Sequence, residues 1–223
     1  MVSYWEMINR SIPNLPPTNS KVYIAVAGAG ILWFAMFSPW TSPFVPLWPA
    51  MSCSAVALSI SAFLTDISLR ERLRKIALRD ALAGAALAAA FWALFWGCER
   101  IASSWFDFAR PQIDSIYSLA DGSSRWTVAA ILLLLIGPAE EIFWRAFVQH
   151  NLSASCGRWR GFLITTLCYS LVHIWSFNLM LILAAAVIGS AWGLLYLFFP
   201  KRIGAIVISH ALWDVAAFVL FPL

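Results

Sequence analysis

Six ionisable side chains lie inside long apolar stretches of this sequence, where an unpaired charge is costly. They are Glu140, Glu141, Arg145, His173, His210 and Asp214. A carboxylate or an imidazole held away from water is suited to act as a general base, and a buried arginine supplies a fixed positive charge. All six occupy three apolar stretches in the last half of the chain. This clustering indicates one shared polar chamber for acid–base chemistry.

The stretch GPAEEIFWRAF places two carboxylates and an arginine on one predicted helix. Glu141 and Arg145 are four residues apart, so they share a helix face and are expected to form an ion pair. Glu140 is rotated by about 100° from Glu141, because a helix has 3.6 residues per turn. We therefore expect Glu141 to be structural and Glu140 to be available as a base.

The two histidine motifs have the same four-residue spacing. Tyr169 and His173 stand in YSLVH, and His210 and Asp214 stand in HALWD. Each pair therefore lies on one helix face. At about 1.5 Å of rise per residue, Glu140, His173 and His210 can share a level between the bilayer midplane and the cytoplasmic side. Taken singly, an intramembrane histidine is commonly a hydrogen-bond partner between helices, and only the combination favours a chamber.

The composition predicts the kind of scaffold that holds these residues. Of 223 residues, 61% are hydrophobic and only 12% are charged. A soluble domain carries about twice that charged fraction. The apolar residues come in long blocks with tryptophans at several block ends, which is typical of an all-α, polytopic membrane helix bundle. We expect residues 1–223 to form one integral membrane domain in a lipid bilayer, with no nucleic-acid partner.

Seven apolar segments are long enough to cross a bilayer. They cover residues 22–40, 44–64, 81–97, 126–149, 160–177, 179–199 and 203–222. The connection 98–125 is the longest and is amphipathic, so it predicts an interfacial helix. The fifth and sixth segments are so close that they must form a tight hairpin. Gly137 and Pro138 predict a kink in the fourth segment, which either admits water or substrate or only serves packing.

The distribution of lysine and arginine predicts the orientation. Eleven basic residues fall in the N-terminal tail, 1–21, and in the even-numbered loops, whereas Arg100, Arg110 and Arg125 fall on the other side. The positive-inside rule then places the N-terminus in the cytoplasm and the C-terminus outside, in a bacterial inner membrane. The basic run at 70–80 is expected to contact anionic lipid or, alternatively, to dock a protein substrate.

The three motifs together resemble those of the CAAX protease and bacteriocin-processing family, also called the abortive-infection family of membrane endopeptidases. EEIFWR is similar to its EExxxR motif, YSLVH to F-x-x-x-H, and HALWD to H-x-x-x-N or H-x-x-x-D. The order of the motifs and their placement in membrane segments also match. The resemblance covers residues 126–218, the expected catalytic core, and implies an intramembrane endopeptidase of the glutamic type.

The resemblance implies a role for each motif residue. Glu140 and His173 would activate a water molecule that attacks the scissile carbonyl. His210 and the residue four positions later, Asp214, would hold the oxyanion. The residues that shape and hold the site would be Glu141 and Arg145.

Two residues depart from the family pattern. Tyr169 replaces the usual phenylalanine, and its hydroxyl needs a partner inside the membrane. Asp214 stands where many members have asparagine. An ionised Asp214 cannot donate a hydrogen bond, so it would be protonated or would instead orient His210.

The motif chemistry allows two readings of the cofactor. The family is also described as metalloproteases, and Glu140, His173 and His210 would then bind zinc with water in the fourth position. The sequence has no H-E-x-x-H helix and no further ligand that is clearly placed. We therefore expect catalysis without a cofactor, and zinc is the alternative.

The expected partner is a membrane-associated peptide or protein that is cleaved near its C-terminus. Some small, tryptophan-rich members resemble processing enzymes for C-terminal sorting tags in exosortase-like systems. Two other classes of function compete: a non-catalytic membrane protein, such as a bacteriocin-immunity or scaffolding factor, and an ion-coupled transporter with Glu140 as a proton relay. The combination of Glu140, His173 and His210 favours the enzyme, and no inverted repeat supports the transporter.

Overall fold

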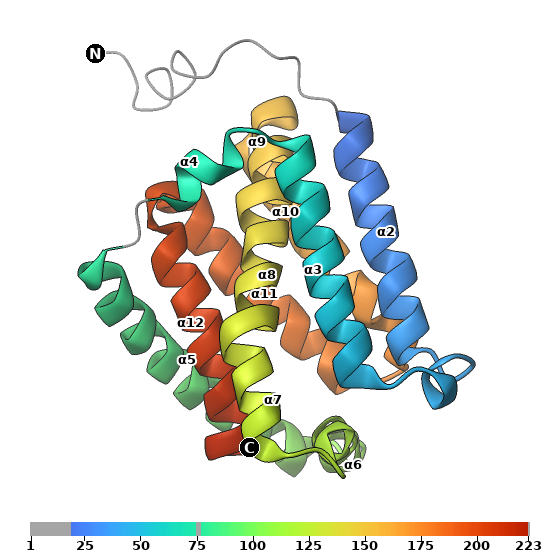
Figure 1. Cartoon of the computed structure of the whole chain (residues 1–223). Coiled ribbons are helices and arrows are strands. Elements are labelled where there is room, and N and C mark those ends of the chain that lie inside the picture. Colours follow the sequence, from blue (N-terminus) through green and yellow to red (C-terminus); the bar gives the residue numbers. More distant parts are fainter. Residues whose placement is uncertain (1–18, 75–76, 223) are drawn as a thin grey trace.

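The computed structural model describes residues 19–74 and 77–222. Within these residues every regular element is a helix (Figure 1), so the expected all-α membrane bundle is confirmed. Residues 1–18 lie outside the described part. Of the predicted tail, 1–21, only the last three residues are described, and they form the first turn of α2.

Six helical stretches among the described residues are long and apolar enough to cross a membrane: Ser20–Phe37, Leu47–Thr65, Leu78–Trp105, Arg125–Cys156, Leu179–Phe198 and Pro200–Leu220. Four of them correspond to α2 (Asn19–Phe37), α3 (Leu47–Thr65), α5 (Leu78–Trp105) and α11 (Leu179–Phe198). The last consists of η6 (Pro200–Arg202), α12 (Ile203–Val215) and the π-helix η7 (Ala216–Leu220). Each stretch overlaps one predicted segment.

The remaining predicted segment, 160–177, is divided into α10 (Arg158–Leu171) and the 3-10 helix η5 (Val172–Ser176). Neither part alone has the length of a span. The chain then reverses within two residues: Phe177 has a left-handed φ of 50°, and the Asn178 side chain accepts a hydrogen bond from the Leu181 N–H at 2.9 Å, which caps α11. The predicted tight hairpin between the fifth and sixth segments is therefore present.

The stretch Arg125–Cys156 is one continuous helical run with changes of pitch. Its parts are α7 (Arg125–Ile131), η3 (Leu132–Ile136), α8 (Gly137–Glu141), η4 (Ile142–Gln149) and α9 (His150–Cys156), in which η3 and η4 are π-helical. Such wider turns frequently occur at functional sites. A Cβ atom at Gly137 would lie only 2.8 Å from the Cα atom of Ala211 in α12. Gly137 thus serves packing, because it lets α8 and α12 approach closely.

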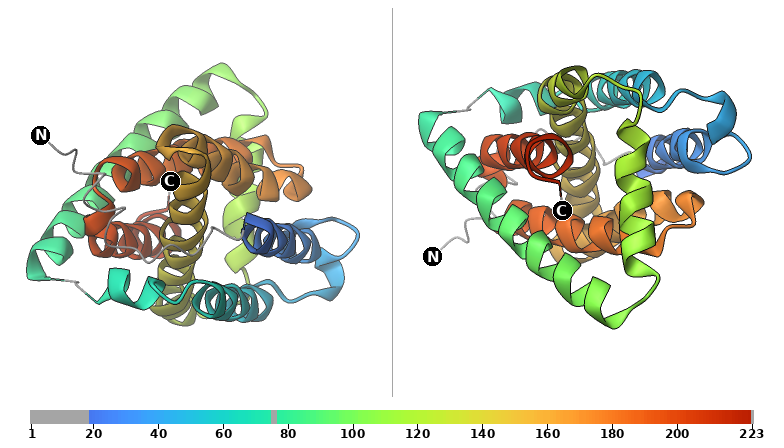
Figure 2. Two further views of the ribbon diagram at one scale, coloured as in Figure 1. Left: turned by 90° about the horizontal axis from the view of Figure 1, so that it is seen from above. Right: turned by 90° about the horizontal axis from the view of Figure 1, so that it is seen from below.

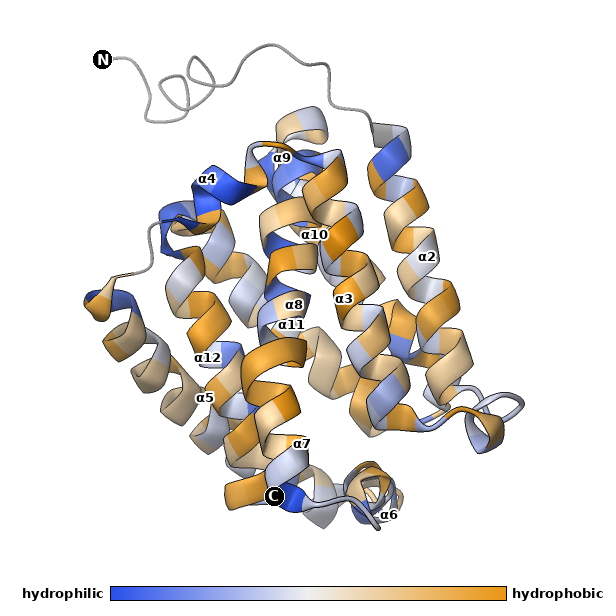
Figure 3. Ribbon diagram, in the orientation of Figure 1, coloured by the Kyte–Doolittle hydropathy of each residue, from blue (hydrophilic) through white to orange (hydrophobic). Residues whose placement is uncertain are grey.

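The two ends of the bundle differ in charge. One end, which we call the basic end, includes α4 (Leu69–Leu73) and the turns that precede α10 and α12, and Figure 3 shows its hydrophilic residues around α4 and α9. Its basic side chains include Arg70, Arg72, Arg74, Arg158, Arg160, Lys201 and Arg202. The start of α2 lies at this end, and the C-terminal end of the chain lies at the other (Figure 1).

The opposite end, which we call the α6 end, is covered by α6 (Ala109–Tyr117), the helix expected in the connection 98–125. Short 3-10 turns, η1 (Ser42–Phe44) and η2 (Ser118–Ala120), complete this end. Seen from below, α6 crosses the bundle near the start of α11 (Figure 2). The Asn178 side chain donates to the Gln112 carbonyl at 2.8 Å, and the Met180 N–H donates to the Gln112 side chain at 3.0 Å. These bonds hold α6 against the hairpin that carries His173.

Candidate active site

Five side chains of the predicted motifs line one cavity of about 390 Å³ inside the bundle, together with Glu99 and Tyr117. The five are Glu140, Tyr169, His173, His210 and Asp214. Because α8, α10, η5 and α12 each supply at least one of them, only the packing of several helices creates the chamber. The rest of the lining is mostly apolar, which is typical of a ligand pocket with a few placed polar groups.

Glu141 and Arg145 form the buried ion pair that their spacing predicts. Arg145 Nη1 donates to Glu141 Oε1 at 2.8 Å, and both side chains are at most 1% exposed. The same carboxylate oxygen is 2.7 Å from His210 Nδ1. Arg145 Nη2 also donates to the Gly189 carbonyl at 3.2 Å, and its guanidinium lies 4.6 Å from the centre of the Tyr169 ring. The pair of Glu141 and Arg145 therefore links its own helix to α11 and α12 behind the cavity.

Glu140 is held differently from its neighbour. Its Oε2 atom accepts a hydrogen bond from the Tyr169 hydroxyl at 3.1 Å. The departure from phenylalanine at position 169 thus has a definite consequence: the hydroxyl finds its partner in the carboxylate of the first motif. Glu140 is 9% exposed and faces the cavity, whereas Glu141 is fully buried.

The hydrogen bonds of His173 determine its tautomer. The Trp33 indole N–H donates to His173 Nε2 at 3.2 Å, so Nε2 carries the lone pair. His173 Nδ1 therefore carries the proton, which it donates to the Tyr169 carbonyl at 2.8 Å. Trp33 comes from α2, and the sequence offered no signal for it, since it is a neutral side chain far from all three motifs.

His210 lies between two carboxylates and on an aromatic face. Its Nδ1 atom faces Glu141, and its Nε2 atom is 3.5 Å from Asp214 Oδ2. The imidazole stacks on the Trp192 ring, with centroids 3.9 Å apart and planes at 22°. Trp192, like Trp33, was not predicted from the sequence. This arrangement fits a role for Asp214 in orienting His210.

The residues named for zinc do not form a ligand set in this geometry. Among residues 19–74 and 77–222, no three His, Cys, Asp or Glu side chains are grouped so that they could hold a metal ion. His173 already uses both ring nitrogens for hydrogen bonds, and both nitrogens of His210 face carboxylates. A metal would have to displace these contacts before it could bind.

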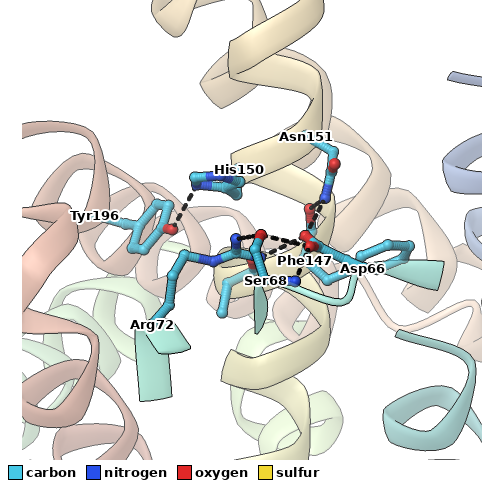
Figure 4. Close-up of polar contacts among 8 residues, drawn as sticks. Asp66, Ser68, Arg72, Phe147, His150, Asn151 and Tyr196 are labelled. Carbon is cyan, nitrogen blue, oxygen red and sulfur yellow. Dashed lines mark hydrogen bonds and ion pairs between the residues drawn. The ribbon is translucent and has the colours of Figure 1, made fainter. Parts of the chain in front are cut away.

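A second polar cluster at the basic end is separate from the cavity (Figure 4). Arg72 pairs with Asp66 at 2.5 Å and also donates to the Ala146 carbonyl in η4 at 2.9 Å. Asn151 donates to Asp66 at 3.0 Å. Burial alone would raise the pKa of Asp66, but the Arg72 charge and hydrogen bonds from Arg72, Ser68 and Asn151 hold that pKa below its usual value. The cluster ties the α3–α4 connection to the helix that carries Arg145.

Residues 122–216 match the protein family described as Type II CAAX prenyl endopeptidase Rce1-like. The matched segment contains every motif residue from Glu140 to Asp214. No curated protein and no solved structure gives a significant match. The family resemblance that the three motifs predict is confirmed, and it supports an intramembrane protease of the CAAX type. Residues 122–216 of this chain, which hold all three motifs, are therefore similar to the Rce1-like family of membrane endopeptidases.

Proposed function

We propose that this protein hydrolyses a peptide bond of a membrane-associated protein, with Glu140 as the general base. The observation that carries this proposal is the asymmetry of the two adjacent carboxylates. Glu141 is fully buried and its Oε1 atom contacts both Arg145 and His210, whereas Glu140 has one oxygen held by Tyr169 and faces the cavity. A base must be positioned yet accessible to the water that it activates, and Glu140 combines both properties.

The first step proceeds as a water attack on the scissile carbonyl. Glu140 takes a proton from the water, the water oxygen bonds to the carbonyl carbon, and the carbonyl oxygen becomes an oxyanion. The water donates its second hydrogen bond to the lone pair on His173 Nε2. It thereby takes the place of the Trp33 N–H, which lies 3.2 Å from that nitrogen. Collapse of the intermediate breaks the C–N bond, and Glu140 returns the proton to the leaving nitrogen.

His210 is the proposed donor to the oxyanion. A neutral imidazole has one N–H and an imidazolium has two. With a carboxylate near each nitrogen, His210 can donate to Glu141 through Nδ1 and turn Nε2–H toward the oxyanion. Asp214 orients that second N–H and does not need to donate itself. The contact of Nε2 with Asp214 is long, at 3.5 Å, so a substrate oxygen competes with it.

We propose that catalysis needs no metal, because the two histidines are engaged by protein groups as described above. The cleavage position near the substrate C-terminus and the setting in a sorting-tag system of the exosortase-like kind are part of the same proposal. Their support is the family resemblance alone.

The test compares purified wild-type protein with Glu140→Gln on membrane-associated proteins of the host, read by mass spectrometry. Glu71→Gln is the matched control, since Glu71 is an exposed glutamate on α4, away from the cavity. Wild type and the control should produce the same fragments, and Glu140→Gln should lower turnover by about 10³-fold or more, because the base is lost.

Two outcomes would change the assignment. Fragments that disappear with a chelator would restore zinc to the mechanism. Identical products from wild type and Glu140→Gln would remove Glu140 as the base and favour a non-catalytic role or an ion-coupled transporter.

A further inference from the structure

The cavity extends from Glu140 in one direction only. On the central helix its lining residues are Leu132, Ile136 and Glu140, which follow one face toward the α6 end. At that end, Ile113, Ile116 and Tyr117 of the α6 helix complete the lining. None of the lining residues belongs to α4, α9 or η6, the described elements of the basic end.

The side of Glu140 that faces the basic end is filled. Phe143, Trp144, Phe147 and Gln149, which follow Glu140 in the central run, are each at most 1% exposed. Leu152, one turn further, is equally buried. A close-packed interior of this kind leaves no passage for a peptide. Access to Glu140 from the basic end is therefore closed in this structure.

The mouth of the cavity lies between α5 and α11. Cys98 of α5 lines the cavity and is exposed. Leu183 and Val187 of α11 also line it, and they are 47% and 43% exposed. These residues lie in the last turns of α5 and the first turns of α11, at the α6 end of both candidate membrane spans. The mouth is therefore next to the α6 end, and the exposed α11 side chains that line it are apolar.

We propose that the substrate reaches Glu140 from the α6 end, opposite the basic end, and that it is the apolar membrane segment of a protein presented on that side. The positive-inside rule makes this the outer side of the membrane. The inference rests on the proposed function, because it names the substrate class of the same site. The apolar lining suits such a segment, and the polar groups at the deep end meet the scissile bond.

The segment must enter in an unwound form. A carbonyl inside a regular helix already accepts a hydrogen bond from its own chain, so it is not free for attack. The apolar walls of the cavity bury the side chains of the segment. His210, at the deep end, is placed to donate a hydrogen bond to the scissile carbonyl of the substrate. An extended stretch next to an apolar segment is the substrate geometry that this cavity accepts.

The first experiment measures access without requiring cleavage. Cys53, Cys98, Cys156 and Cys168 are replaced by serine, and single cysteines are introduced by Ala184→Cys in the cavity, Asp121→Cys near the α6 end and Glu71→Cys on α4. A membrane-impermeant maleimide is applied to spheroplasts and to inverted membrane vesicles. The Ala184 and Asp121 variants should be labelled in spheroplasts, and the Glu71 variant in inverted vesicles.

Labelling of the Ala184→Cys variant from the same side as the Glu71→Cys variant would overturn the proposal, and so would protection of Ala184→Cys from both sides. If the serine substitutions impair folding, labelling of Cys98 in the otherwise unchanged chain, located by mass spectrometry, gives the same decision. Cys98 lines the cavity and should therefore be labelled from the same side of the membrane as the Asp121→Cys variant.

The second experiment measures cleavage of a fluorescence-quenched peptide with a charged N-terminal half and an apolar C-terminal half. The charged half keeps the peptide on the side to which it is added. Wild type should cleave it at least tenfold faster in spheroplasts than in inverted vesicles, and detergent should remove the difference. Faster cleavage in inverted vesicles would overturn the route of entry but not the protease. Equal results for wild type and Glu140→Gln in detergent, with labelling as expected, would count against the proposed function alone.

Discussion

The same helices are packed in two different ways on either side of Glu140. Toward the basic end, Phe143, Trp144 and Phe147 fill the interior, and Arg145 is bonded to three groups there. Toward the α6 end, small side chains such as Ala102 and Ala184 line an open cavity. The half toward the basic end, which we call the filled half, holds the catalytic side chains in place. The half toward the α6 end, which we call the hollow half, is less densely packed and leaves room for a substrate.

The ion pairs of the two halves show the same contrast. Arg145 and Glu141 pair at 2.8 Å with at most 1% exposure, whereas Arg110 and Asp114 pair at 2.9 Å with side chains more than half exposed. The distances and the four-residue spacing are alike. The environment differs, since water can solvate the second pair if it is broken but not the first.

The largest expected effect is that of Arg145→Ala. It leaves Glu141 buried without its cation, which should lower the free energy of unfolding by about 3–5 kcal/mol. Asp114→Ala is the control in the hollow half, since it breaks only the exposed pair with Arg110, and it should cost less than about 1 kcal/mol. Thermal unfolding of both variants in the same detergent measures the difference. Equal losses would mean that the buried pair is not what holds the filled half together.

The next prediction exchanges side-chain volume between the halves. Phe147→Ala should cost about 3–5 kcal/mol, because it opens a void in a filled interior. Ala184→Phe should change the free energy of unfolding by less than about 1 kcal/mol, since it occupies existing space, but it should lower turnover at least tenfold. Unfolding curves and the peptide assay together test this contrast. A strongly destabilised Ala184→Phe protein would show that the cavity is smaller than described.

A smaller effect is expected for Tyr169→Phe. The hydroxyl bond to Glu140 positions one carboxylate oxygen, so its loss should lower turnover by about tenfold, which corresponds to ~1.4 kcal/mol. Because the family pattern has phenylalanine here, folding should be retained. Tyr196→Phe is the matched control, since its hydroxyl lies 3.2 Å from His150, outside the cavity. Unchanged turnover in Tyr169→Phe would remove this bond from the mechanism.

The smallest expected effect concerns pH and the cluster at the basic end. The folded-state pKa of Asp66 lies below its usual value of about 4, so its contacts stabilise the fold above that pH. This stability should be lost as pH falls through the lowered pKa. The midpoint of thermal unfolding between about pH 6 and pH 3 should therefore fall more for wild type than for Asp66→Asn. Parallel curves would show that ionised Asp66 adds no stability.

Contacts within one helix could be predicted from the sequence, whereas contacts between helices could not. The pairing of Glu141 with Arg145 follows from a four-residue spacing, and the structure has it at 2.8 Å. The need of the Tyr169 hydroxyl for a partner was also predictable. That the partner is Glu140, 29 positions away, depended on how α8 and α10 pack. The contact between Trp33 and His173 spans 140 positions, and no local pattern indicates it.

The sequence by itself determined six of the seven predicted membrane-spanning segments and the three motifs. Each of these depends on local hydropathy or on the spacing of residues along one helix. Only the tertiary structure decided that Glu141 joins His210, that Glu140 faces the cavity, and that the cavity extends toward α6. A cavity is the space that side chains of many helices leave unfilled. Its position therefore depends on how those helices pack together, which no single stretch of sequence records.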